Sequence, residues 1–155
     1  NSCILLDKMT ANIENYNKII ENLETQSPQT ILLVVTKNRT LEEIFPFIER
    51  GHRIFGENKV QEARMKFSDE FITQKKINLH LIGPLQTNKV IDALKLFSTI
   101  QTIDRGKLAD VIIEAKKKLA DKMITQNFYI QVNIGREPQK SGVAIEELEP
   151  LYQKC

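Results

Sequence analysis

Ile31-Leu32-Leu33-Val34-Val35-Thr36-Lys37 is the stretch of sequence that decides the fold. Five aliphatic residues follow one another without polar alternation, which predicts a parallel strand over about 31–36 that is buried on both faces. Lys37 then stands at the carboxyl end of this strand, where α/β folds and (β/α) barrels gather their ligands. In a partly dry pocket a lysine amine loses its proton more readily and can attack a carbonyl as a Schiff-base nucleophile. The alternative is a lysine that ends a strand and reaches into water.

The composition indicates one soluble globular domain. The chain has 155 residues, of which 41% are hydrophobic and 27% are charged. A net charge of +2 is too small to indicate binding to nucleic acid or to an anionic membrane. Cys3 and Cys155 lie at opposite ends without the spacing of metal ligands, and neither a secretory signal nor an apolar span of membrane length is found. We therefore expect a cytoplasmic protein without a metal site.

Helix and strand signals alternate along the chain. Apolar residues at three- and four-residue steps from Leu6 and Met9 to Leu23 predict a first helix. Further strands are predicted at about 52–55, 77–82, 98–103 and 128–134, with helices at about 40–48, from 59 into the seventies, at 87–96 and 108–119, and from Glu146 onward. Five βα units with short connections predict one continuous α/β domain over residues 1–155.

A (β/α) TIM-type barrel is favoured over an open doubly wound sheet. The first loop lacks the G-x-G-x-x-G pattern of dinucleotide-binding open sheets. Polar residues occupy alternate positions on the later strands, namely Asn78 and His80, Thr102 and Asp104, and Gln131 and Asn133. A barrel would point such side chains toward a common interior, although each alone could be a buried polar residue with satisfied hydrogen bonds. Five strands cannot close a ring of eight, so we expect an incomplete barrel.

Five motifs occur in an order and spacing that match one known family. They are Val35-Thr36-Lys37, Phe55-Gly56-Glu57-Asn58 with Val60-Gln61-Glu62, the block from His80 to Lys89, Thr102-Ile103-Asp104, and Gln131-Val132-Asn133-Ile134 followed by Lys140-Ser141-Gly142. The series resembles the pyridoxal phosphate homeostasis proteins, also called the YggS family or PLP-binding proteins. The block from His80 to Lys89 is the most specific of the five.

This resemblance implies a barrel like the N-terminal domain of bacterial alanine racemase. It implies that pyridoxal 5′-phosphate (PLP) is held as an internal aldimine on Lys37. It also places Asn58, His80 and Asn133 around the cofactor and Lys140 near its mouth. Such proteins are held to bind and buffer PLP, in vitamin B6 and amino-acid metabolism, without turnover.

Two carboxylates, Glu57 and Asp104, are candidate acids or bases. A carboxylate in the first turn of a helix, however, often only complements the helix dipole. No Ser-His-Asp arrangement or set of metal ligands emerges from the sequence.

Family members continue beyond the point that corresponds to Cys155, through the loops that form the phosphate cradle. We therefore expect a truncated chain whose phosphate site cannot be assigned, with open barrel edges that favour self-association or a complementing chain. Two other interpretations stay open. One is an alanine racemase-type enzyme, which needs a second proton-transfer group. The other is an α/β fragment that binds an unspecified anion or partner chain.

Overall fold

The computed structural model describes residues 2–155 and, among them, the side chains from residue 12 onward. In chain order the elements are α1 (Ser2–Gln26), β1 (Val34–Val35), α2 (Leu41–Glu49), β2 (Ile54–Glu57), α3 (Val60–Lys66), α4 (Asp69–Lys75), β3 (Asn78–Leu81), η1 (Thr87–Lys89), α5 (Val90–Leu94), β4 (Thr99–Ile103), α6 (Gly106–Leu119), η2 (Ala120–Lys122), β5 (Asn127–Ile130), η3 (Ile145–Glu147) and α7 (Leu148–Lys154). The side chains of Cys3, Leu6 and Met9 lie outside the described part.

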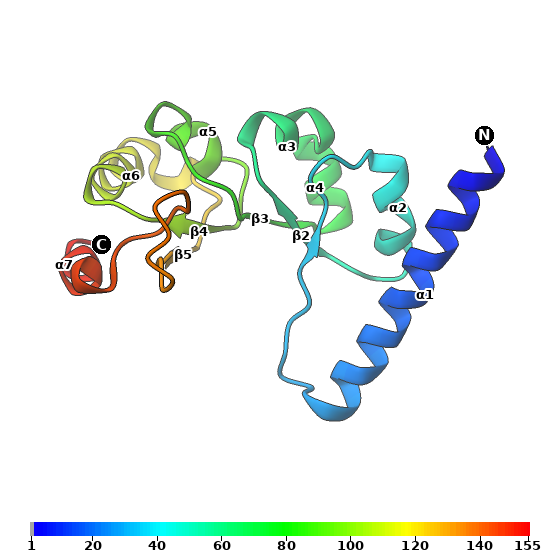
Figure 1. The fold of residues 1–155 in the computed structure, drawn as a ribbon. Helices are drawn as coiled ribbons and strands as arrows, with labels where there is room; N and C mark the ends of the chain where they lie inside the picture. Colours follow the sequence, from blue (N-terminus) through cyan, green and yellow to red (C-terminus); the bar gives the residue numbers. More distant parts are fainter. Residues whose placement is uncertain (1) are drawn as a thin grey trace.

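The five strands form one parallel sheet in the order β1-β2-β3-β4-β5 (Figure 1). Strands that follow one another in the sequence are therefore neighbours in the sheet. A (β/α) barrel has this order, whereas a doubly wound sheet reverses direction at a switch point. The predicted fold class is confirmed: the chain forms an incomplete (β/α) barrel, an arc of five parallel strands.

The prediction of a first strand buried on both faces is wrong. Only Val34 and Val35 pair with β2, the side chain of Val35 is 47% exposed, and Ile31 is 72% exposed. β1 lies at the edge of the sheet with β2 as its only partner among the described residues. Without a strand on its other side, this apolar run lacks the second neighbour that would bury it.

The helix predicted from residue 59 is in fact two helices. α3 ends at Lys66, and the next residue, Phe67, has a fully buried side chain. α4 begins after Ser68, whose hydroxyl accepts a hydrogen bond from the backbone N–H of Phe71. A serine at the N-cap satisfies one of the free backbone N–H groups of the first turn and so favours the start of a new helix here. α2 begins with a capping box, in which Thr40 and Glu43 are each bonded to the backbone of the other.

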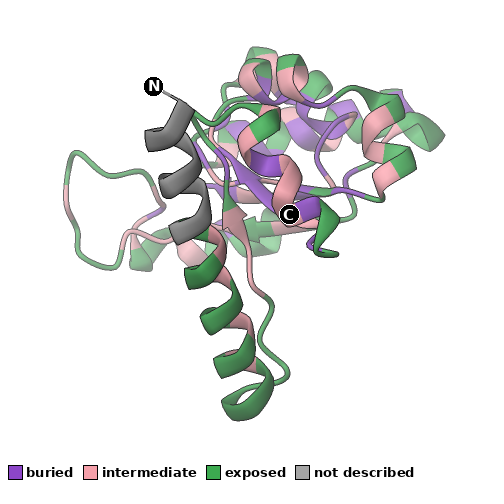
Figure 2. Ribbon diagram, turned by 90° about the vertical axis from the view of Figure 1, so that its right-hand side faces the viewer, coloured by how far each residue is buried: buried purple, intermediate pink, exposed green. Residues whose placement is uncertain are grey.

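The hydrophobic core lies between the sheet and the helices α2–α6. It includes Ile44, Phe55, Ala63, Leu79, Leu81, Leu94, Ile100, Leu108 and Ile112. Figure 1 shows α3, α4 and α5 on one side of the sheet, and Figure 2 shows that buried residues concentrate in the strands and in the helices that pack on them. Side chains on a strand alternate between its two faces, so His80, between the buried Leu79 and Leu81, points to the face opposite this core.

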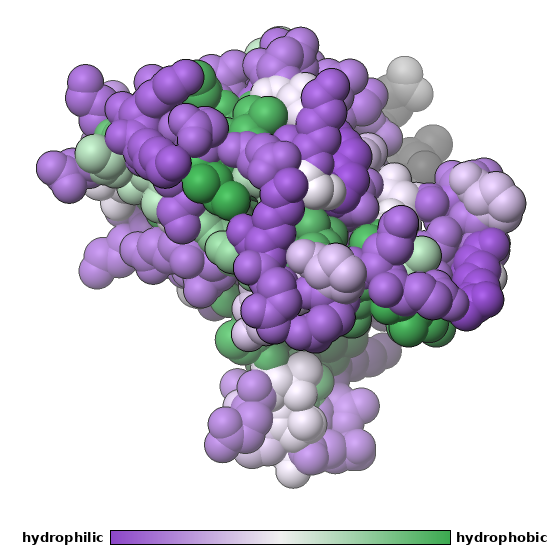
Figure 3. Space-filling model, turned by 90° about the vertical axis from the view of Figure 1, so that its left-hand side faces the viewer, coloured by the Kyte–Doolittle hydropathy of each residue, from purple (hydrophilic) through white to green (hydrophobic). Residues whose placement is uncertain are grey.

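The remaining surface is mostly solvated. The side of the molecule that carries α6 and α7 is largely hydrophilic, with separate small hydrophobic patches (Figure 3). Within residues 2–155, none of the helices has the length and hydrophobicity that a membrane span requires.

Candidate functional site

Lys37 lies in the turn that directly follows β1, at the carboxyl edge of the sheet. Its backbone neighbours are held by the adjacent strand and helix. The N–H of Thr36 donates to the carbonyl of Gly56 at 2.9 Å, and the N–H of Asn38 donates to Oε1 of Glu62 at 2.5 Å. Asn38 has a φ of 58°, so the chain turns sharply after Lys37.

The side chain of Lys37 is exposed. The expected partly dry pocket around it is therefore not formed by the described residues. The cause is the same as for the exposed apolar run of β1, since an edge strand has a neighbour on one side only.

Behind this turn lies a buried ion pair that the motif analysis did not anticipate. Glu57 is the last residue of β2, and its side chain is fully buried. Its Oε1 accepts hydrogen bonds from the ammonium of Lys66 at 2.6 Å and from the hydroxyl of Thr36 at 2.7 Å. The idea that Glu57 complements a helix dipole is therefore wrong, because the carboxylate belongs to a strand and contacts a cation.

His80 meets a partner that the sequence analysis missed. Its Nδ1 lies 2.9 Å from the amide nitrogen of Gln101 on β4. Burial lowers the pKa of His80 below its usual value. Thr102, which was expected to point toward the barrel interior, is instead buried and donates to the backbone carbonyl of Gly83 at 2.8 Å. A shift of one residue along a strand exchanges its two faces, which explains the difference.

Asn58 lies between β2 and α3 and is half-buried. It lines a cavity of about 540 Å³ together with Lys59, Gln86 and Lys89. The loop after β3 packs directly on it, since a Cβ at Gly83 would lie 2.2 Å from the carbonyl oxygen of Asn58. The loops that follow β2 and β3 are thus fixed to each other through their backbones.

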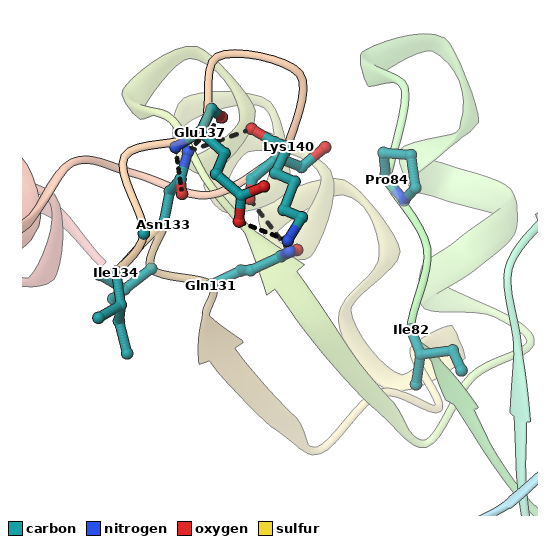
Figure 4. Close-up of a pocket in the computed structure, with 10 residues that line it drawn as sticks. Ile82, Pro84, Gln131, Asn133, Ile134, Glu137 and Lys140 are labelled. Atoms are coloured by element: carbon teal, nitrogen blue, oxygen red, sulfur yellow. Dashed lines mark hydrogen bonds and ion pairs between the residues drawn. The ribbon is translucent and has the colours of Figure 1, made fainter.

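The loop after β5 carries the last two predicted residues (Figure 4). The Asn133 amide nitrogen donates to the carbonyl of Glu137 at 2.9 Å, and its amide oxygen accepts from the Glu137 N–H at 3.2 Å. The exposed ammonium of Lys140 donates to the carboxylate of Glu137. Across a cavity of about 330 Å³, Ile82 and Pro84 face these residues. Asn133 therefore organises its own loop.

The predicted residues share one edge of the sheet. Lys37, Asn58, His80 and Asn133 lie on or shortly after β1, β2, β3 and β5, respectively, and parallel strands end at one edge. Asp104 instead contacts the neighbouring Arg105. In the part of the chain that the structure describes, no three His, Cys, Asp or Glu side chains are grouped as metal ligands.

Two curated proteins match nearly the whole chain. The chain is 34% identical to the pyridoxal phosphate homeostasis protein of Pasteurella multocida over 143 residues, which cover 91% of it. It is 33% identical to the protein of the same name from Aquifex aeolicus over 153 residues, or 99% of it. This chain is homologous to the pyridoxal phosphate homeostasis proteins. The resemblance inferred from the five motifs is confirmed.

Solved structures agree with this relationship. The structure of PipY from Synechococcus elongatus PCC7942 without PLP superposes on 88% of the chain with a TM-score of 0.72 and 30% identity. A second PipY structure, with PLP bound, gives a TM-score of 0.70. The chain spans 59% of the Pasteurella homeostasis protein and 64% of the Aquifex protein. No protein-family model matches it.

Proposed function

We propose that this chain binds PLP covalently on Lys37 and serves as a carrier or buffer of the cofactor. The observation that carries the proposal is the position of Lys37, with an exposed amine at the carboxyl end of β1 and a backbone tied to β2 and α3. When bound, PLP supplies an aldehyde. Lys37 would hold the cofactor through this aldehyde, by a C=N bond whose formation would release water. The PLP-bound PipY structure supports this choice of ligand.

The other predicted residues have distinct parts in the proposal. Asn58 and His80 lie at the ends of the next two strands, where their polar groups would hold the ring of the cofactor. Asn133 holds the loop that carries Lys140 through its two bonds to Glu137. The exposed ammonium of Lys140 attracts the phosphate, because opposite charges favour approach even where water screens them.

We propose binding without turnover. Proton transfer at the α carbon of an amino acid needs a second positioned acid or base beside the lysine. The carboxylate of Glu57 is already bonded to Lys66 and Thr36, and one of the two ring nitrogens of His80, Nδ1, is bonded to Gln101. A racemase-type enzyme would need at least one of these groups free at the cofactor.

The test is a titration of the purified chain with PLP, followed by its visible absorption spectrum. We expect a band of the lysine Schiff base that is lost in Lys37→Ala. The matched control is Lys117→Ala, which removes another exposed amine, on α6 far along the chain. The same band in Lys37→Ala would overturn the assignment.

We also propose that copies of this chain associate through the edges of the sheet. β1 and β5 each have one strand neighbour, and Val35 and Ile134 are 47% and 78% exposed. Unpaired edges with apolar side chains favour pairing with another chain. Light scattering should give a mass above that of one chain, and Val35→Lys should lower it. A monomer at all concentrations would contradict this proposal.

A further inference from the structure

The ion pair between Glu57 and Lys66 is among the most buried polar features of the protein. The side chains are 0% and 7% exposed, and the second carboxylate oxygen of Glu57 has no hydrogen-bond partner within residues 12–155. The free energy needed to remove two charges from water offsets much of the electrostatic attraction between them. Apolar residues of the same volume often stabilise a fold equally well. Stability alone therefore gives a poor reason for these charges.

Their contacts lead to the residue on the near side of Lys37. The ammonium of Lys66 donates to the backbone carbonyl of Thr36 at 2.7 Å, in addition to its bond with Glu57. The hydroxyl of Thr36 donates to the same carboxylate oxygen. Both the main chain and the side chain of Thr36 are thus held by one buried pair.

A second carboxylate holds the far side. Oε1 of Glu62 accepts the N–H of Asn38 at 2.5 Å and lies 3.5 Å from the Lys66 ammonium. The bond from Asn38 is the main reason that the pKa of Glu62 is lowered, so the carboxylate is charged at neutral pH. The three charges of Glu57, Glu62 and Lys66 therefore bracket Lys37 from both sides.

Strand pairing holds only the near side of Lys37, because β1 consists of two paired residues, Val34 and Val35, and the last backbone bond to β2 is that of the Thr36 N–H with Gly56. We infer that Lys66, through Glu57 and Glu62, is a positioning residue that fixes the backbone on both sides of Lys37 and so aims its amine. The inference rests on the proposed function of Lys37 as the residue that holds PLP. In this role Lys66 contacts no reacting atom of Lys37 or of the cofactor.

The first test needs no ligand. Lys66→Met removes the ammonium and keeps most of the stem, and amide hydrogen exchange then reports on residues 36–39. We expect exchange there to rise by about tenfold or more, because the bonds to Thr36 and Asn38 lose their common anchor. The control is Arg64→Met, on the same helix, which breaks an ion pair of 2.6 Å with Asp69 on the exposed side. Equal exchange in the two variants would overturn the inference.

Where Lys66→Met fails to fold, Glu62→Met replaces it. This variant keeps the Lys66–Glu57 pair and removes the acceptor of the Asn38 N–H, together with the longer contact of 3.5 Å between Glu62 and Lys66. Exchange should then rise at Asn38 and stay low at Thr36. No change at Asn38 would count against the network.

The second test separates positioning from general damage. Lys66→Met should weaken PLP binding by about tenfold and leave the affinity for pyridoxine 5′-phosphate, which lacks the aldehyde, unchanged. Lys66→Arg should restore much of the PLP affinity. Equal losses for both ligands would overturn the positioning role. A wild-type chain that forms no Schiff base would count against the proposed function, while the exchange experiment would still decide on the network.

Discussion

The amide nitrogen of Gln101 on β4 lies 2.9 Å from Nδ1 of His80 on β3. An NH₂ group can only donate, so Nδ1 is the unprotonated ring nitrogen and Nε2 carries the proton. Because burial also lowers its pKa, we expect NMR to find the Nε2–H form with a pKa below about 6.5. Gln101→Leu should weaken this tautomer preference toward that of free histidine. A wild-type pKa at or above the usual value would contradict this environment.

His52 should make the fold sensitive to mild acid. Its side chain is buried, with Nε2 2.8 Å from the carbonyl oxygen of Ile54, and burial lowers its pKa. Above about pH 6.5 the ring is neutral in both states, so it adds no pH dependence there. Below that value the unfolded chain takes up the proton first, and the free energy of unfolding falls until the lower folded pKa is passed.

The measurement is urea denaturation at about pH 7.5 and about pH 5.5, on either side of the ordinary histidine pKa. Wild type should lose more stability over this interval than His52→Gln, which has no proton to take up at this position. Equal losses in the two proteins would show that His52 does not contribute.

Two glycines allow two effects of an added Cβ on the free energy of unfolding to be separated, namely steric contact with neighbouring atoms and backbone strain. Gly51 and Gly142 both have positive φ, at +89° and +125°. A Cβ at Gly51 would meet nothing within 4 Å, whereas at Gly142 it would lie 2.6 Å from the backbone nitrogen of Asn133. Gly51→Ala should cost about 1–2 kcal/mol of unfolding free energy, from strain alone. Gly142→Ala should cost more in urea denaturation, and equal costs would contradict the close approach.

The proposal of binding without turnover can be tested directly. Positioned acid–base groups accelerate proton transfer by about 10²–10⁴-fold, and the proposal leaves none free at Lys37. In deuterated water with PLP and alanine, the chain should exchange the α proton of alanine no faster than free PLP does. Enzyme-like exchange that disappears in Lys37→Ala would favour the racemase-type interpretation instead.

The order of the strands could be predicted from the sequence, because each apolar run and each amphipathic segment is short and separately bounded. The strand at 99–103 and the capping box at Thr40 follow from local patterns that need no tertiary context. The exposure of β1 could not be predicted from its residues. An edge strand and a central strand share the same apolar composition, and only the neighbouring strands decide between them.

The site was predicted in part for the same reason. Strand ends locate Lys37, Asn58 and His80 at one edge, although their roles toward PLP stay predictions. The pairing of Glu57 with Lys66 depends on how α3 packs on β2. The two residues are nine positions apart, and this spacing in the sequence does not predict a contact between them. Thr102 was expected to face the same interior as His80, but Gln101 is the residue of β4 that contacts His80. Alternation shows which residues share a face, and the register is needed to tell which face that is.

Peptide mapping tests the central claim most directly. The chain is mixed with PLP, reduced with borohydride to fix any Schiff base, digested and analysed by mass spectrometry. The proposal predicts one dominant labelled site, Lys37, whose amine follows β1 and whose backbone is anchored on both sides. Label on Lys140 instead, or spread evenly over the exposed lysines, would contradict it.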